Sequence, residues 1–326
     1  MSIEFAVIGT NFITDRFLEA AKTVPEFHLK AVCSRTREKG EAFARKHGAE
    51  LVFDDPDALA ACTEVDAVYI ATPNCCHMDQ SIRMMRGGKH VLCEKPVASN
   101  AKEFARMRAA AEENGVVLLE AMRNYFAPGF AAIRENLPKL GAIRRVSFEF
   151  CQYSSRYDKF RNGIIENAFN PDLSNGALMD IGVYCVHPMA AMFGMPEKIT
   201  GSSQKLRGGV EGAGVLIAQY DGFQVDCTYS KIYNSQNSSQ IQGEDGVMVI
   251  REVGNPRDVT IHYRKGGEEK LVFPSLENNM PYEIQTFLDL IREGSVHHRY
   301  LDYSRMELEI MDEMRRQQGI VFPADR

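Results

Sequence analysis

Two patterns of hydrophobic and polar residues divide the chain. Up to about residue 119, short apolar runs rich in β-branched residues alternate with longer segments in which apolar residues recur every three or four positions. The apolar runs predict strands at residues 4–8, 28–33, 66–72, 89–93 and 116–119, and the periodic segments predict helices at 17–22, 37–47, 79–88 and 101–115. Continuous apolar strands separated by helices indicate a parallel sheet covered on both faces. Residues 1–120 are therefore predicted to form a doubly wound α/β domain.

After residue 120 the apolar residues alternate with polar ones over longer runs, such as residues 144–154, 214–220 and 223–231, and several runs are joined by Gly-rich turns. Alternation with tight connections is typical of antiparallel strands with one buried face. Two helical segments follow, at 281–294 and 303–319. Residues 121–326 are therefore predicted to form an α+β domain on a large, mostly antiparallel open sheet.

The composition excludes several classes of protein. A length of 326 residues suits two domains, and 44% hydrophobic with 25% charged residues is typical of a globular protein. The net charge of -6 gives no general attraction to nucleic acid or to anionic membranes. No signal peptide pattern and no apolar window of about 18 residues occurs, so we expect a cytoplasmic protein. Eight cysteines without a CxxC pair indicate reduced thiols rather than a zinc or disulfide framework.

Ligands of open parallel sheets bind beyond the carboxyl ends of the strands, so the residues after each apolar run are the first candidates. The first strand leads into GTNFIT, where Gly9 permits a tight turn. Asn11 tolerates a left-handed conformation and offers an NH₂ group to a phosphate, so it can partly replace a second glycine. Thr14 demands a wider approach of helix and strand. Alone, this pattern is equally compatible with an ordinary strand-to-helix turn.

Ser34 and Arg35 follow the second strand, at the position where an NAD site places an acidic residue on the ribose hydroxyl. A hydroxyl and a guanidinium can bind a 2′-phosphate instead, which predicts NADP in preference to NAD. The alternative is that Arg35 belongs to a solvated helix start.

Two further strands end in chemically active residues. Thr72 and Pro73 shape the loop after the strand at 66–72, and Glu94 and Lys95 follow the strand at 89–93, although a Glu-Lys surface turn would give the same spacing. The complete set of predicted cofactor-binding residues is Gly9, Thr10, Asn11, Phe12, Ile13, Ser34, Arg35, Thr72, Pro73, Asn74, His77, Glu94 and Lys95.

In the second domain, the segment at 174–188 predicts a helix whose spacing puts Asp180, Tyr184 and His187 on one face. Burying a carboxylate, a phenol and an imidazole together is unfavourable unless they are paired or used in chemistry. A structural hydrogen-bond network is the alternative interpretation.

The segment at residues 154–171, named here the substrate segment, is rich in Arg, Tyr, Asn and Phe and precedes that helix. It predicts substrate contacts from Arg161 and Asn167, with Tyr184 and His187 contributing from the helix; an ordinary surface loop is the alternative. No metal site is expected, since the adjacent His297 and His298 point in different directions and have no third ligand in the sequence.

In combination, these motifs resemble the Gfo/Idh/MocA family of glucose-fructose oxidoreductases and inositol dehydrogenases, and within it the dihydrodiol dehydrogenase-like members. The resemblance rests on an N-terminal Rossmann unit, on EKP after its fifth strand, on GALMDIGVYCVH in the following domain, and on YEIQTFLDLIREG near the end. It implies an NAD(P)-dependent oxidoreductase acting on a sugar, polyol, cyclic diol or related carbonyl compound, and a homodimer or higher homo-oligomer formed through the second domain's sheet.

The resemblance also implies catalytic roles. Lys95 matches the lysine of the family's EKP motif, Asp180 its helix aspartate, and Tyr184 its acid/base residue. A phenol releases its proton only near pH 10 in water, so a nearby cation is required, and Lys95 is the expected one. Asp180 would orient Lys95 or the substrate.

Four positions depart from the family's pattern. Asn11 and Thr14 replace small residues of the glycine motif, Asn175 replaces a glycine, and Tyr125 stands where many relatives carry arginine. Two other functions stay open at this point: a non-catalytic NADP-binding sensor or regulator, and a hydrolase or lyase that uses the nicotinamide transiently.

Overall fold

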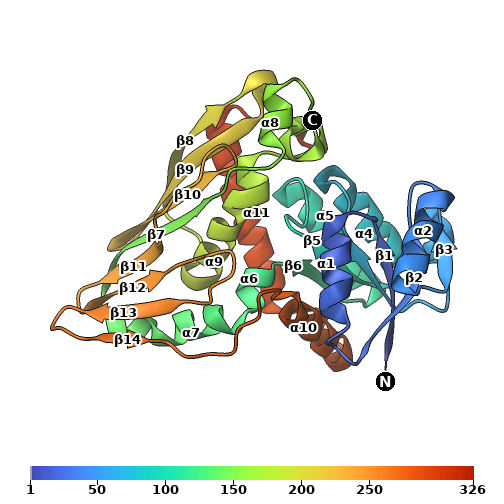
Figure 1. The fold of residues 1–326 in the computed structure, drawn as a ribbon, viewed down its shortest axis with the longest axis horizontal. Helices are drawn as coiled ribbons and strands as arrows, with labels where there is room; N and C mark the ends of the chain where they lie inside the picture. Colours follow the sequence, from blue (N-terminus) through green and yellow to red (C-terminus); the bar gives the residue numbers. More distant parts are fainter. Residues whose placement is uncertain (1) are drawn as a thin grey trace. The chain divides into compact units, whose positions relative to one another are not determined.

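The structure is a computed structural model that describes residues 2–326. The chain divides into two compact units, each built on its own sheet (Figure 1). Unit 1 contains the chain up to Ala121 together with Asn278–Arg305. Unit 2 contains Met122–Glu277 together with Met306–Arg326.

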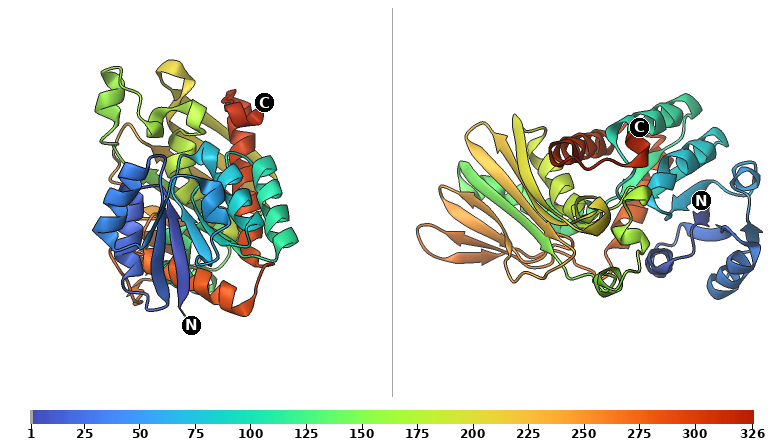
Figure 2. Two further views of the ribbon diagram at one scale, coloured as in Figure 1. Left: turned by 90° about the vertical axis from the view of Figure 1, so that its right-hand side faces the viewer. Right: turned by 90° about the horizontal axis from the view of Figure 1, so that it is seen from above.

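Unit 1 is built on a six-stranded parallel sheet with the strand order β3-β2-β1-β4-β5-β6. Its elements are β1 (Ile3–Ile8), α1 (Phe12–Ala21), β2 (Phe27–Cys33), α2 (Arg37–His47), β3 (Leu51–Phe53), α3 (Pro56–Ala60), β4 (Ala67–Ile70), η1 (Asn74–Cys76), α4 (His77–Arg86), β5 (His90–Glu94), α5 (Ala101–Asn114), β6 (Leu118–Ala121), α10 (Met280–Glu293) and the start of α11 (Arg299–Gln318). Helices α1 and α2 lie on one face of the sheet, and α4 and α5 lie on the other (Figure 2). The strand order reverses between β1 and β4, as in a Rossmann fold, so the predicted doubly wound domain is confirmed.

The division of the chain differs from the prediction. The first boundary lies one residue later, after Ala121, but Asn278–Arg305 returns to unit 1 instead of staying with the second domain. Phe287 of α10 packs against Phe5 of β1, with ring centroids 6.0 Å apart, and the Asn278 side chain donates to the carbonyl of Arg16 at 3.0 Å. The helical period reveals the apolar face of α10 but not the sheet on which that face packs.

Unit 2 is built on an eight-stranded sheet with the order β14-β13-β12-β11-β7-β10-β9-β8 (Figure 1). Its elements are α6 (Arg123–Phe126), α7 (Pro128–Asn136), η2 (Leu137–Leu140), β7 (Ile143–Cys151), α8 (Tyr157–Arg161), η3 (Asn167–Phe169), η4 (Pro171–Leu173), the π-helical turn η5 (Leu178–Gly182), α9 (Val183–Phe193), β8 (Lys198–Lys205), η6 (Arg207–Gly209), β9 (Glu211–Tyr220), β10 (Phe223–Ser230), β11 (Ser239–Gly243), β12 (Gly246–Ile250), β13 (Val259–Tyr263), β14 (Glu268–Lys270), the end of α11 and η7 (Pro323–Asp325). All strand pairs are antiparallel except β7 with β10, so the predicted mostly antiparallel sheet is confirmed.

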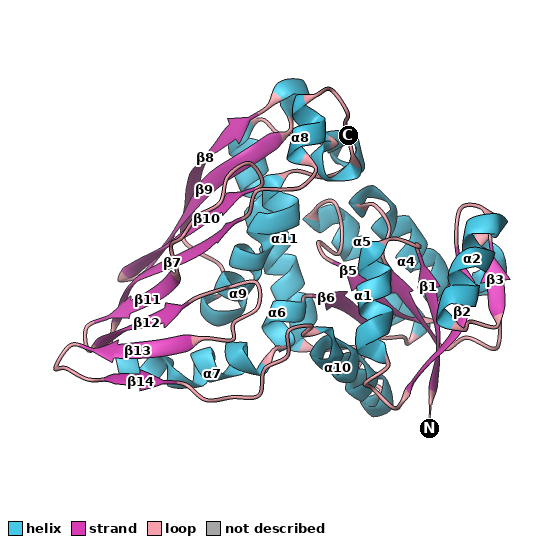
Figure 3. Cartoon of the chain, in the orientation of Figure 1, coloured by secondary structure: helices cyan, strands magenta, loops and turns pink. Residues whose placement is uncertain are grey.

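One face of this sheet is covered by the helix that carries the candidate catalytic residues. Helix α9 and the preceding turn η5 pack on β7 and β10 (Figure 3). A side chain at Gly182 would lie 3.0 Å from the ring of Tyr229, so the glycine permits the close approach of η5 to β10. On β9, Leu216 and Ala218 are buried, whereas Val215 and Ile217 are 36% and 40% exposed. The alternation in the sequence therefore corresponds to one buried and one open face.

Candidate functional site

The loop after β1 in unit 1 is shaped by a glycine that no other residue could replace. Gly9 has a φ of 107°, and a Cβ atom there would lie 2.4 Å from the carbonyl oxygen of Ala71. The turn after β1 and the end of β4 are therefore in direct backbone contact. Only a residue without a side chain permits this approach, which brings the first turn of α1 to the carboxyl edge of the sheet.

Asn11 caps helix α1, a role that the sequence analysis did not assign to it. Its φ is −104°, so it does not occupy the left-handed region. Its side-chain oxygen accepts from the N–H groups of Ile13 at 2.9 Å and Thr14 at 3.4 Å, and its NH₂ group donates to the carbonyl of Ala71 at 2.7 Å. The NH₂ group is thus engaged by the protein itself. Asn11 fixes the start of α1, where Phe12 and Ile13 form the first turn after the loop residues Gly9 and Thr10.

Ser34 and Arg35 lie directly after β2, at the same edge of the sheet. The backbone N–H of Ser34 donates to the carbonyl of Phe53 at the end of β3, at 3.0 Å, and the residue is 8% exposed. Arg35 is exposed. The backbone of Ser34 is thus fixed and Arg35 is exposed, and a 2′-phosphate contact by these two residues stays a prediction.

His77 holds two strand-end loops together. Its ring is fully buried, with Nδ1 2.9 Å from the carbonyl oxygen of Pro96 and Nε2 3.0 Å from that of Thr72. Burial lowers the pKa of His77, and the two backbone carbonyls act in the opposite direction. The Thr72 hydroxyl donates to Gln80 at 2.7 Å, and Asn74 at the start of η1 is 7% exposed. Among the predicted cofactor residues of this loop, His77 is therefore the one whose buried ring fixes the backbone at Thr72 and at Pro96.

The turn after β5 is not the surface turn that the spacing alone allowed. Glu94 is 7% exposed, and its Oε1 accepts from the hydroxyl of Tyr69 at 2.5 Å. Its Oε2 accepts from the backbone N–H of Lys95 at 3.3 Å, and a cis peptide bond links Lys95 to Pro96. Glu94 thus anchors the turn inside unit 1, while the Lys95 side chain is half-buried at the edge.

In unit 2, Asp180 and Tyr184 lie on either side of a change in helix geometry. Asp180 belongs to the π-turn η5 and Tyr184 to the first turn of α9. Single π-turns of this kind often occur at functional sites. The Asp180 carboxylate lies 2.8 Å from the ammonium group of Lys231, which the sequence interpretation had not singled out.

Tyr184 is bound by an arginine that the sequence interpretation also missed. The phenolic oxygen of Tyr184 accepts from Nε of Arg123 at 3.3 Å, and the Arg123 guanidinium lies 5.2 Å from the centroid of the Tyr184 ring. Next to Arg123, the Asn124 NH₂ group donates to the carbonyls of Tyr184 at 3.2 Å and Val253 at 3.0 Å. The tyrosine therefore has a cation at its oxygen and a hydrogen bond at its backbone.

His187 is buried and paired with a buried carboxylate. Its ring is 3% exposed, with Nδ1 2.6 Å from Oε2 of the fully buried Glu307, and it makes an edge contact with the ring of Tyr125 at 5.3 Å. Tyr125 in turn accepts from Arg134 at 3.3 Å. A structural hydrogen-bond network, the alternative interpretation of this helix in the sequence, would consist of contacts of this kind. A substrate contact by His187 stays a prediction.

The substrate segment has a small core of its own. Phe160, Ala168 and Phe169 are buried together with Val210, and the rings of Phe160 and Phe169 stack at 5.1 Å. Asn167 is exposed, as is Arg161, whose guanidinium lies 3.5 Å from Asp158. The two residues predicted to contact substrate are thus carried on a packed support.

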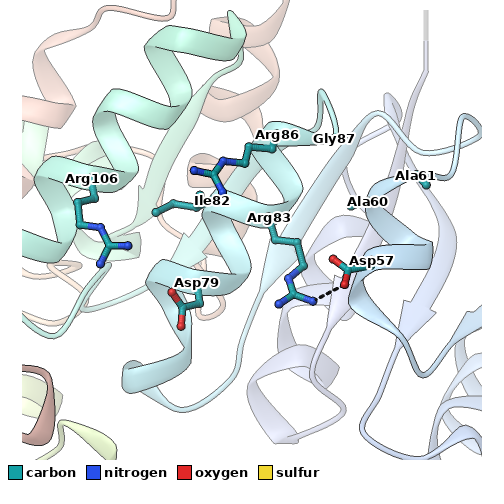
Figure 4. Close-up of a pocket in the computed structure, with 9 residues that line it drawn as sticks. All are labelled: Asp57, Ala60, Ala61, Asp79, Ile82, Arg83, Arg86, Gly87 and Arg106. Carbon is teal, nitrogen blue, oxygen red and sulfur yellow. Dashed lines mark ion pairs between the residues drawn. The ribbon is translucent and has the colours of Figure 1, made fainter.

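A hollow of about 670 Å³ lies over helices of unit 1 (Figure 4). It is lined by Asp57, Ala60, Ala61, Asp79, Ile82, Arg83, Arg86, Gly87 and Arg106. Arg83 forms an ion pair with Asp57 at 2.9 Å. These residues belong to α3 and the residue after it, to α4 and the residue after it, and to α5.

Within residues 2–326, no helix is long and apolar enough to cross a membrane. All eight cysteines are free thiols, and four of them are buried. The Sγ atoms of Cys75 and Cys76 are 3.8 Å apart.

Comparison with known proteins places these features in a family. Residues 3–122 match the Gfo/Idh/MocA oxidoreductase family with an NAD-binding Rossmann fold, and residues 134–249 match the Gfo/Idh/MocA C-terminal domain. The chain is 48% identical to scyllo-inositol 2-dehydrogenase (NADP(+)) IolU of Bacillus subtilis, over 99% of both chains. It is 28% identical to the trans-1,2-dihydrobenzene-1,2-diol dehydrogenase of Mus musculus, over the full length of both.

Solved structures share the fold. The 3-ketoreductase KijD10 of Actinomadura kijaniata, solved with NADP and TDP-benzene, has a TM-score of 0.85 at 24% identity and covers 97% of this chain and 98% of its own. The aldose-aldose oxidoreductase of Caulobacter crescentus has a TM-score of 0.84 at 21% identity and covers 98% of each chain. With the two matching domains and the close relative, these findings confirm the resemblance seen in the motifs: the chain belongs to the Gfo/Idh/MocA family of oxidoreductases.

Proposed function

We propose that this protein is an NADP-dependent oxidoreductase that transfers a hydride between the nicotinamide and a carbon bearing a hydroxyl group in a cyclic polyol or sugar. The observation that carries the proposal is the contact between the phenolic oxygen of Tyr184 and Arg123, within a chain 48% identical to an inositol dehydrogenase. That relative makes scyllo-inositol and its ketone the first substrates to test. Other inositols, aldoses and cyclic diols belong to the same chemical class.

The loop around Gly9 fits a dinucleotide. Its backbone contact with Ala71 leaves no room for a Cβ atom, and the capped helix α1 begins three residues later. The N-terminus of a helix favours a pyrophosphate, which Gly9, Thr10, Asn11, Phe12 and Ile13 would hold. Ser34 and Arg35 would bind the 2′-phosphate. Thr72, Pro73, Asn74, His77, Glu94 and Lys95 would form or support the nicotinamide end. When bound, NADP(H) accepts or supplies the hydride.

Tyr184 is the proposed acid/base. In oxidation it takes the proton of the substrate hydroxyl, and in reduction it returns a proton to the carbonyl oxygen. A guanidinium 3.3 Å from the phenolic oxygen stabilises that oxygen when it is negatively charged. Two cations are therefore assigned to this step, Arg123 and the lysine of the family motif, Lys95. Asp180 is assigned to orient Lys95 or a substrate hydroxyl, and Arg161, Asn167 and His187 to substrate contacts.

The test is a substrate screen with the purified full-length protein, NADP⁺ or NADPH, and a panel of inositols, inosose ketones, aldoses and cyclic diols. We expect turnover with at least one cyclic polyol and its loss in Tyr184→Phe. Tyr263→Phe is the matched control, because the Tyr263 hydroxyl also bonds to a side chain, Glu269 at 2.5 Å, but on the edge strands β13 and β14. NADPH binding without turnover of any compound would favour a sensor instead.

We also infer a homodimer formed through the open face of the eight-stranded sheet. Val215 and Ile217 on β9 support it, since both are apolar and more than a third exposed. Light scattering should give twice the chain mass, and Ile217→Lys should shift the protein towards monomer. A monomeric wild-type protein would refute the dimer.

A cytoplasmic location is supported by the state of the thiols. The eight free cysteines suit a reducing compartment, where disulfides are rare. Cell fractionation of the tagged full-length chain should recover it with cytoplasmic markers, and recovery in a membrane or secreted fraction would overturn the assignment.

A further inference from the structure

Lys231 is a buried cation in unit 2. It directly follows β10, its side chain is 2% exposed, and its backbone N–H donates to the carbonyl of Gly212 at 2.8 Å. Removing an ammonium group from water is unfavourable unless acceptors replace the water. The contacts of the Lys231 side chain therefore identify what this charge holds in place.

The ammonium group of Lys231 contacts two segments at once. It lies 2.8 Å from Oδ2 of Asp180, donates to the backbone carbonyl of Ala168, and lies 4.7 Å from the centroid of the Phe169 ring. A lysine offers three donors around one compact charge, so a carboxylate, a carbonyl and a ring face can share it. A methionine of similar volume would fill the space without any of these interactions.

The two segments have different proposed tasks. Asp180 lies in η5, four residues before Tyr184, whereas Ala168 and Phe169 lie in η3 at the end of the substrate segment. Phe169 stacks on Phe160, so the position of η3 also determines how the core of that segment packs. One buried charge thus connects the segment assigned to substrate with the helix assigned to proton transfer.

We propose that Lys231 is a positioning residue that fixes the Asp180 carboxylate and the η3 turn on one ammonium group, and so sets the substrate segment relative to Tyr184. This inference deepens the proposed function, and its kinetic part rests on that function because Asp180 and Tyr184 are assigned to chemistry there. Displacement of a reacting group by about 1 Å can reduce a rate about 100-fold, so a residue of this kind affects turnover without touching substrate.

Arg207 provides a matched control. Its guanidinium donates to the carbonyl of Phe160 at 2.8 Å and lies 5.3 Å from the centroid of the Phe160 ring. It therefore makes the same two kinds of contact with the substrate segment as Lys231, a carbonyl and a ring face. Arg207→Met therefore removes a support of the segment while the pair of Lys231 with Asp180 stays in place.

The kinetic test compares Lys231→Met, Arg207→Met, Asp180→Asn and the double variant Asp180→Asn/Lys231→Met in the full chain. We expect Lys231→Met to lose about 10- to 100-fold in kcat/KM with unchanged NADPH affinity, and Arg207→Met to stay near wild type. Because part of the effect of Lys231 passes through Asp180, the double variant should lose clearly less than the product of the two single losses. Losses that multiply, or a folded Lys231→Met with wild-type kcat/KM, would overturn the proposal.

Amide hydrogen exchange separates this inference from the proposed function. In Lys231→Met, exchange should rise in residues 167–173 and in 178–182 together, whereas Arg207→Met should leave 178–182 protected. If the wild type turns over no substrate, the proposed function fails, and joint exchange in both segments still decides the role of Lys231. If Lys231→Met does not fold, Asp180→Asn gives the answer: unchanged exchange at 167–173 in that variant would refute a shared anchor.

Discussion

The two units hold their candidate residues by different means. At the carboxyl edge of unit 1, Asn11 and His77 bind backbone groups, and Gly9 contacts Ala71 through the backbone itself. In unit 2 the candidate groups are held by charged side chains, as in the pair of Asp180 with Lys231. In unit 1 the candidate residues therefore lie in loops fixed by backbone contacts, whereas in unit 2 they are held by ion pairs.

The difference follows from what each unit has to place. A dinucleotide binds over a long edge, through N–H groups and loop shape, so backbone geometry suffices. Proton transfer needs individual side-chain atoms at fixed positions and with fixed charges, and buried ion pairs supply both. Loss of one partner of a buried pair leaves the other uncompensated, so unit 2 should be the more sensitive to single substitutions.

The largest expected effect on stability comes from the loss of Glu307. This residue lies on α11 and is the buried partner of His187. Removing one member of such a pair costs about 3–5 kcal/mol, so Glu307→Ala should lower the denaturant midpoint strongly. The control is Glu313→Ala on the same helix. Glu313 pairs with Arg316 at 2.7 Å in water, which holds its pKa at about 2, and an exposed pair contributes at most about 1 kcal/mol. Equal losses in the two variants would contradict the claim that unit 2 depends on its buried charge pairs.

The variant Arg35→Ala tests whether a side-chain charge of unit 1 determines the preference for NADPH over NADH. A hydrogen bond to a charged group contributes about 1.5–3 kcal/mol, so Arg35→Ala should weaken NADPH binding about 10- to 100-fold while NADH binding stays constant. Fluorescence titration of the nicotinamide measures both affinities. Arg37→Ala, two residues along, is the control, since Arg37 pairs with Glu41 at 3.2 Å. An unchanged NADPH to NADH ratio in Arg35→Ala would leave Arg35 as a solvated helix residue.

Acid should act on unit 1 through one buried histidine and two partly buried ones. Burial lowers the pKa of His77, and it lowers those of His90 and His298 as well. Because each folded-state pKa lies below the unfolded value of about 6.5, the full stability is present above that pH and falls as the pH drops below it, by up to about 1.4 kcal/mol per pH unit for each group. Denaturant melts between neutral and mildly acidic pH should show the decline.

The control for this pH effect is His77→Gln, which carries no titrating ring at the buried position. Its stability should fall less steeply with acid than that of the wild type. An identical slope in the two proteins would remove His77 from the account.

The smallest expected effect is the loss of the cap at Asn11. Asn11→Ala should reduce stability by about 1 kcal/mol, because two N–H groups at the start of α1 lose their acceptor. Asn11→Ser should restore the cap but not the bond to Ala71. Any NADPH affinity lost in Asn11→Ala should therefore recover only in part in Asn11→Ser. Full recovery with serine would show that the bond to Ala71 adds nothing to the cofactor edge.

Local patterns predicted most of the fold and part of the site. The buried strands of unit 1 and the alternating strands of unit 2 were evident because burial on two faces or on one face leaves different sequence periods. The strand β3 was missed, since its three residues are too few to show a period. The return of α10 to unit 1 was missed because periodicity identifies a buried face but not its partner.

The site residues that escaped prediction have partners far away in the sequence. Lys231 meets Asp180 across 51 positions and Arg123 meets Tyr184 across 61, and no local pattern encodes such pairs. The Asn11 cap was different, because an asparagine just before a helix with Asp15 in its first turn is a local signal.

The most direct test of the central claim follows the hydride itself. The full-length protein is incubated with NADP⁺ and scyllo-inositol, or the best substrate of the screen, carrying deuterium on its ring carbons, and the NADPH formed is analysed by mass spectrometry. The account predicts deuterium at C4 of the nicotinamide with the wild type, and at least about 100-fold slower transfer by a Tyr184→Phe variant that binds NADPH normally. Transfer at the wild-type rate in Tyr184→Phe, or no transfer by a wild-type protein that binds NADPH, would contradict it.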